Sequence, residues 1–110
     1  WEDYTRSVPE VVLPDADLQR AWAYGLHKQA GLTPPQGVAA TLQGPWMAET
    51  ELPPWSNDYH FNINLQMIYW PALPTNRAQH LHPLWEMIRG WLPTLHANAA
   101  DFLGRPGALM

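Results

Sequence analysis

The chain has 110 residues, a formal net charge of −4 and no cysteine, and only 15% of its residues are charged. This balance argues against a nucleic-acid partner, because no basic patch is available to meet phosphates. No apolar run approaches the roughly 18 residues of a membrane span, so no membrane partner is expected. Seven Trp and twelve Pro with so few charges are unusual for a small free-standing domain, whose large surface should be rich in charge. We therefore expect an excerpt that needs the rest of its parent chain for packing.

The first clear helix is expected from Asp15 to Ala30. Residues 1–13 show little helical periodicity, and residues 7–14 should form an extended leading loop bounded by prolines. Asp15 is a suitable N-cap, and the apolar residues that follow recur at helical spacing on one face. Gly31 is expected just past the helix end, and Pro34-Pro35 prevents continuation.

A long connection follows from residue 32 to residue 55, rich in proline and glycine. Loops of this length inside compact domains are often functional. Residues 42–46, LQGPW, are typical of a tight turn that presents Gln43 and Trp46. Trp46 could face a ligand or simply anchor the loop, and the composition leaves both possibilities open.

The stretch from Pro53 to Ala72, PPWSNDYHFNINLQMIYWPA, combines aromatic rings with uncharged hydrogen-bonding side chains. A pyranose offers apolar C–H faces to rings, and hydroxyls that donate to and accept from amides. The stretch therefore predicts a sugar site and a glycan substrate. Its candidate binding residues are Trp55, Asp58, His60, Asn62, Asn64 and Gln66, with Trp46 from the preceding turn.

The spacing in HFNINLQ, residues 60–66, has a period of two. An extended segment would place the four polar residues on one side and the three apolar residues on the other. On a helix, Asn62 and Asn64 would point about 200° apart. If both serve one site, the chain is therefore extended there or just entering a helix. The alternatives are a half-buried strand with a polar face, or Asn64 acting as a helix cap.

Two further helices are expected after this stretch. One runs from about Asn64 to Trp70 and stops at Pro71. The other runs from His82 to Phe102, with an apolar stripe, a kink or break at Pro93 and a cap at Gly104. The chain is therefore predicted to be all-α, with three to four helices. The histidines are not spaced as metal ligands, and no metal or other cofactor is expected.

LQGPW, the 53–72 stretch, Asn76 and residues 82–84 together resemble the catalytic domain of glycoside hydrolase family 95, the α-L-fucosidase family of the six-hairpin glycosidases. Residues 13–31 resemble the helix that precedes this motif. The resemblance implies a partial (α/α)6 toroid, with residues 1–110 as the N-terminal part of the barrel. It also implies an inverting glycosidase, in which asparagines matching Asn62 and Asn64 position the hydrolytic water. The family's general acid, a Glu, and its catalytic Asp have no match here and are expected outside this segment.

Some residues depart from the family pattern. The family commonly has Asn at the place of Ile68 and an acidic residue near Leu73. A lost polar group at Ile68 would leave a sugar hydroxyl without its partner. Altered sugar choice and loss of activity are both open. The alternative to an enzyme is a non-catalytic carbohydrate-binding relative, and a third possibility is a purely structural role for the two asparagines.

Overall fold

The computed structural model describes residues 2–110, and within that range every regular element is a helix. The α-helices are α1 (Glu2–Arg6), α2 (Ala16–Leu32), α3 (Asn64–Tyr69) and α4 (His82–Leu103). Three short 3-10 helices complete the list: η1 (Pro54–Asn57), η2 (Trp70–Ala72) and η3 (Ala78–Leu81). The prediction of an all-α chain with three to four helices is confirmed.

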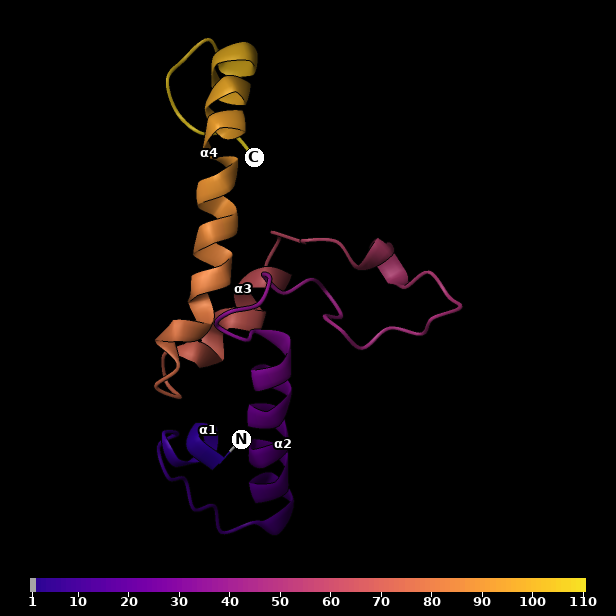
Figure 1. The fold of residues 1–110 in the computed structure, drawn as a ribbon, viewed down its shortest axis with the longest axis vertical. Helices are drawn as coiled ribbons and strands as arrows, with labels where there is room; N and C mark the ends of the chain where they lie inside the picture. The colour runs from indigo at the N-terminus through magenta and orange to yellow at the C-terminus, as the bar shows by residue number, and fades with distance from the viewer. Residues whose placement is uncertain (1) are drawn as a thin grey trace.

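The molecule is elongated, with extents of 56 × 35 × 24 Å. Figure 1 shows α2 and α4 extending in opposite directions from α3, which lies at their junction, while the loop between α2 and α3 projects sideways. The small core lies at this junction and consists of Ala40, Leu65, Tyr69 and Leu84. Tyr69 anchors the loop there, because its hydroxyl accepts a hydrogen bond from the Ala40 amide at 2.9 Å. Burial is the main cause that raises the pKa of Tyr69 above its usual value.

The start of α2 follows from Asp15, whose carboxylate accepts from the amides of Asp17 at 2.7 Å and Leu18 at 3.0 Å. The predicted end of this helix at Gly31 is wrong. The helix continues to Leu32, and Thr33 closes it by donating from its amide and its hydroxyl to the Gln29 carbonyl. Because Gly31 has no side chain, the Trp46 ring can pack against α2 at this position. A Cβ at Gly31 would lie 3.2 Å from that ring.

Within residues 1–13 the sequence predicted no helix, yet α1 forms at Glu2–Arg6. Residue 1 lies outside the described range. The hydroxyls of Thr5 and Ser7 donate to the carbonyls of Glu2 and Asp3, each at 2.9 Å, which satisfies acceptors that so short a helix leaves unpaired. Tyr4 fixes α1 to α2 by donating its hydroxyl to the Leu26 carbonyl at 3.2 Å. Tertiary contacts therefore stabilise a helix in a segment whose apolar residues do not recur at helical spacing.

The last helix, α4, begins with Pro83 in its first turn and ends at Gly104, whose φ of 61° is the predicted left-handed cap. Pro93 lies inside α4 and does not divide it into two helices. Of the predicted apolar stripe, Leu84 and Leu95 are buried, whereas Leu92 is 37% exposed. Residues after Gly104 fold back along α4, where the Leu109 amide donates to the Leu95 carbonyl at 2.9 Å (Figure 1). No helix among residues 2–110 is both long and apolar enough to cross a membrane.

Gly44 is a position where only glycine fits comfortably. Its φ is 59°, and a Cβ there would overlap the end of the Leu32 side chain. Gly44→Ala is expected to destabilise the protein by about 1–2 kcal/mol, the cost of a left-handed L-residue, with some relief from movement of Leu32. Gly25→Ala is the matched control, because nothing lies near its Cβ and alanine favours a helix interior by about 0.5–1 kcal/mol. Thermal melts of the full-length protein should show a lower midpoint for the first variant only. Equal midpoints would contradict the role assigned to Gly44.

Candidate functional site

Two loop segments meet through the side chain of Asn57. Its Oδ1 accepts a hydrogen bond from the Gln43 amide at 2.6 Å, and its Nδ2 donates to the Gly44 carbonyl at 3.2 Å. The same Nδ2 lies 2.9 Å from the Met47 sulfur. A backbone bond from the Leu42 amide to the Asp58 carbonyl, 3.1 Å, adds a second link. The LQGPW turn and the WSND segment therefore form one unit.

The WSND segment has an unusual backbone. Trp55, Ser56 and Asn57 have φ values of 55°, 53° and 53°, which makes a short left-handed turn. Such a conformation costs an L-residue roughly 1–2 kcal/mol, so a run of them persists only where surrounding contacts hold it. The bonds of Asn57 to the neighbouring loop are contacts of this kind. The turn leaves Trp55 64% exposed.

Next to this turn, three of the predicted binding residues lie close together. The rings of Trp55 and His60 are 4.2 Å apart between centroids and meet edge to face at 72°. Nδ1 of His60 lies 3.6 Å from Oδ1 of Asp58. The Asp58 carboxylate therefore lies beside His60, while the side chain of Asn57 accepts from a backbone N–H, that of Gln43.

The chain between the two asparagines is not extended. The Asn64 amide donates to the Asn62 carbonyl at 2.7 Å across Ile63, whose φ of 62° and ψ of −37° form a γ-turn. Ile63 is 51% exposed, so the division into a polar and an apolar side that an extended chain would give does not occur at residues 60–66. Of the two conformations consistent with a shared site, the chain takes the second, because α3 begins at Asn64. Asn64 is not a helix cap, since the cap position is Ile63 and no side-chain cap bond forms there.

A cavity of about 250 Å³ opens in front of Asn64. Leu42 and Gln43 from one loop segment and Pro54 and Trp55 from the other complete its lining. An apolar ring face beside two amide side chains is an arrangement suited to a sugar ring. His60 adjoins this cavity through its contact with Trp55.

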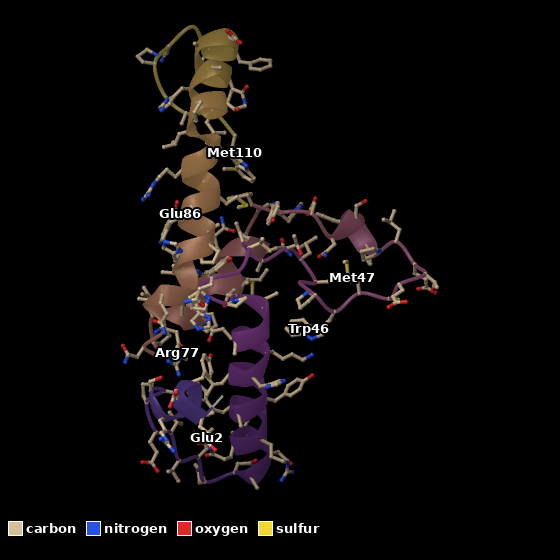
Figure 2. The ribbon with its side chains drawn as sticks, viewed as in Figure 1. Glu2, Trp46, Met47, Arg77, Glu86 and Met110 are labelled. Atoms are coloured by element: carbon tan, nitrogen blue, oxygen red, sulfur yellow. The ribbon has the colours of Figure 1, made fainter. Side chains whose placement is uncertain are left out.

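The remaining candidates lie outside the lining of this cavity. Asn62 is exposed, one γ-turn before Asn64. Gln66 is exposed and donates from its side chain to the Phe61 carbonyl at 2.9 Å. Trp46 lies beside α2 (Figure 2), with Nζ of Lys28 4.0 Å above its ring and Gly31 against its edge. The turn at residues 42–46 therefore presents Gln43 to the cavity, while Trp46 packs on the helix.

Sequence reasoning missed Asn57. A possible signal was the Ser-Asn-Asp cluster, since Asn tolerates positive φ and bonds to nearby backbone groups. No group of three His, Asp or Glu residues within positions 2–110 could hold a metal ion.

A second polar cluster, away from this cavity, involves His80. Its Nδ1 is 2.8 Å from the Thr33 hydroxyl, and both side chains are fully buried. Burial and then the Arg77 charge lower the pKa of His80 below its ordinary value, so the ring is neutral near pH 7. This cluster joins α2 to η3 and is structural.

Comparison with known proteins places the chain among glycosidases. The profile of the glycosyl hydrolase family 95 catalytic domain matches residues 13–110. A probable alpha-fucosidase A of Aspergillus niger is 39% identical over 81 residues, which cover 73% of this chain and 10% of that protein. Alpha-L-fucosidase 2 of Arabidopsis thaliana is 40% identical over 71 residues, which cover 64% of this chain and 8% of that protein.

The matched region is thus about a tenth of the length of these curated relatives. No solved structure matches the chain significantly. The family match spans nearly the whole chain and includes all of the residues that line the cavity. The chain therefore belongs to the glycosyl hydrolase family 95 catalytic domain family.

Proposed function

We propose that the chain is the N-terminal part of an (α/α)6 barrel whose parent protein hydrolyses α-L-fucosides with inversion. The observation that carries this proposal is Asn64 in a cavity beside Trp55, within a segment that matches the family throughout. The relatives are named as fucosidases, and the proposal extends that activity to the parent protein. The exposed apolar side chains on α3, η2 and α4 support the expectation of further barrel helices around this segment, among them Met67, Trp70, Trp85 and Phe102.

The chemistry assigned to the asparagines is positioning. An amide is not a base near neutral pH, but its carbonyl oxygen can accept a hydrogen bond from a water molecule and direct a lone pair of that water toward the anomeric carbon. Inverting glycosidases hold their two catalytic groups ~6.5–9.5 Å apart to admit this water. The general acid and the Asp that completes the water site are expected from the remainder of the parent chain. Trp55 would cover an apolar sugar face, and Gln43 and His60 would meet hydroxyls.

A second candidate is a carbohydrate-binding relative without catalysis. Ile68 favours it, because this half-buried side chain packs against the cluster of Leu65, Tyr69 and Leu84. At the position where the family commonly has Asn, Ile68 offers no hydrogen bond.

An assay of the full-length protein with an aryl α-L-fucoside separates the two. Release of β-L-fucose as the first product, followed by proton NMR of the anomeric signal, is expected of an inverting fucosidase. Binding of L-fucose by calorimetry without turnover would favour the carbohydrate-binding relative. Neither turnover nor binding would contradict both.

A further inference from the structure

The cavity in front of Asn64 has walls that come from two separate loop segments. Leu42 and Gln43 belong to the segment of residues 41–47, whereas Pro54 and Trp55 belong to the segment of residues 53–58. The chain between these two segments, residues 48–52, is exposed. Their spacing therefore depends on the contacts that bridge them.

The side chain of Asn57 supplies most of those contacts. Its oxygen accepts from the Gln43 amide and its nitrogen donates to the Gly44 carbonyl, so it pairs with one donor and one acceptor of the opposite segment. Asn57 is itself two residues from Trp55 within the left-handed turn. It thus holds the backbone of Gln43 against the turn that carries Trp55.

We propose that Asn57 is a positioning residue that sets the width of the sugar-sized cavity between Gln43 and Trp55. The expected effect on fucoside binding rests on the proposed function, whereas the effect on the spacing of the two loop segments does not. Asn57 is absent from the cavity lining, and its amide groups already bond to Gln43, Gly44 and Met47. Its effect on a sugar is therefore indirect and acts through the walls.

The residue type fits this role in two respects. Asparagine accepts a positive φ more readily than other non-glycine residues, and its amide offers both an acceptor and a donor. Glycine would keep the backbone conformation but make neither bond. Aspartate would keep the acceptor for the Gln43 amide. Its second carboxylate oxygen would face the Gly44 carbonyl oxygen, and the two oxygens would repel each other.

These differences give a matched set of variants in the full-length protein: Asn57→Gly, Asn57→Asp and the control Ser56→Gly. Ser56 shares the left-handed turn, is exposed and makes no side-chain hydrogen bond to any of residues 2–110. Loss of two hydrogen bonds in Asn57→Gly is expected to raise KM for an aryl fucoside about 10- to 30-fold with little change in kcat. Asn57→Asp should also raise KM, and Ser56→Gly should leave it within about two-fold of the wild type.

A readout without substrate separates this inference from the proposed function. In hydrogen–deuterium exchange, the Gln43 amide should exchange faster in Asn57→Gly than in the wild type or in Ser56→Gly, because its acceptor is lost. Faster exchange in a protein that hydrolyses no fucoside would support the link between the walls and count against the fucosidase proposal. An unchanged KM in an active Asn57→Gly enzyme, or unchanged exchange at Gln43, would overturn the inference. If Asn57→Gly does not fold, KM and the exchange of the Leu42 amide are measured in Asn57→Asp. Aspartate keeps the acceptor of the Gln43 amide, but its repulsion of the Gly44 carbonyl should loosen the neighbouring bond from the Leu42 amide to the Asp58 carbonyl. No change in either quantity would overturn the inference.

Discussion

Replacing Asn64 by alanine in the full-length enzyme is expected to lower kcat on the order of 100-fold, with a much smaller change in KM. Asn64 lines the cavity at the start of α3, and we expect its amide to hold the attacking water in line with the anomeric carbon. Misplacing a reacting group by about 1 Å can cost 10²-fold in rate, and an oriented water matters most in the transition state. Asn62→Ala is expected to act in the same direction. Steady-state kinetics on an aryl fucoside give both parameters.

The control for these variants is Asn76→Gly. Asn76 is an exposed asparagine outside the cavity, and its φ of 56° suits glycine. Its kinetics should match the wild type. A purely structural role for Asn62 and Asn64 predicts the reverse pattern, with a lower melting temperature for each alanine variant and near-normal turnover in the folded fraction. That outcome would contradict the catalytic assignment.

Arg77→Met is expected to destabilise the protein by roughly 2–4 kcal/mol. Arg77 is 2% exposed and lies between α1 and the start of α4 (Figure 2). Its guanidinium donates to the Ser7 hydroxyl at 2.6 Å and to the Tyr4 carbonyl, and it stacks 3.9 Å from the centre of the Tyr4 ring. Hydrogen bonds to a charged group contribute about 1.5–3 kcal/mol each to stability. Replacing Arg77 by methionine also removes the cost of burying a charge, which offsets part of the lost stability.

The melting temperature and limited proteolysis of the full-length protein measure this effect. New cleavage within residues 2–14 is expected, because Arg77 ties that segment to the body of the molecule. Arg89→Met is the matched control, since Arg89 is 71% exposed and pairs with Glu86 on the surface. Such pairs contribute about 0–1 kcal/mol. Equal melting temperatures for the two variants would show that Arg77 does not hold α1.

The parts of the fold predicted from the sequence are those determined by local signals. Asp15 begins α2 and Gly104 ends α4 through their own backbone and side-chain chemistry, which residue type alone indicates. The end of α2 was wrongly predicted at Gly31, because this glycine serves to let the Trp46 ring pack against the helix. That contact joins residues far apart in the sequence. Helix α1 was missed for the same reason, since its Tyr4 is held by Leu26 and Arg77, which lie far along the chain.

The candidate site was predicted in part. Trp55, Asp58 and His60 do lie together, and Asn64 does line a cavity with Trp55. The period of two in HFNINLQ left both an extended chain and a chain entering a helix open, because the pattern does not reveal a positive φ at Ile63, which a β-branched residue rarely adopts. Asn57 was missed because two of its partners are backbone groups of another loop, and residue type does not indicate such contacts.

The γ-turn at Ile63 fixes the number of residues between His60 and Leu65. Its hydrogen bond spans a single residue, from the Asn64 amide to the Asn62 carbonyl, and the next amide, that of Leu65, donates to the His60 carbonyl at 3.0 Å. An inserted or deleted residue between positions 60 and 65 would break both bonds and shift α3 relative to the cavity. Residues 48–52, which are exposed, have no such constraint. Length differences among relatives should therefore fall in residues 48–52, while the interval from His60 to Leu65 stays constant in length.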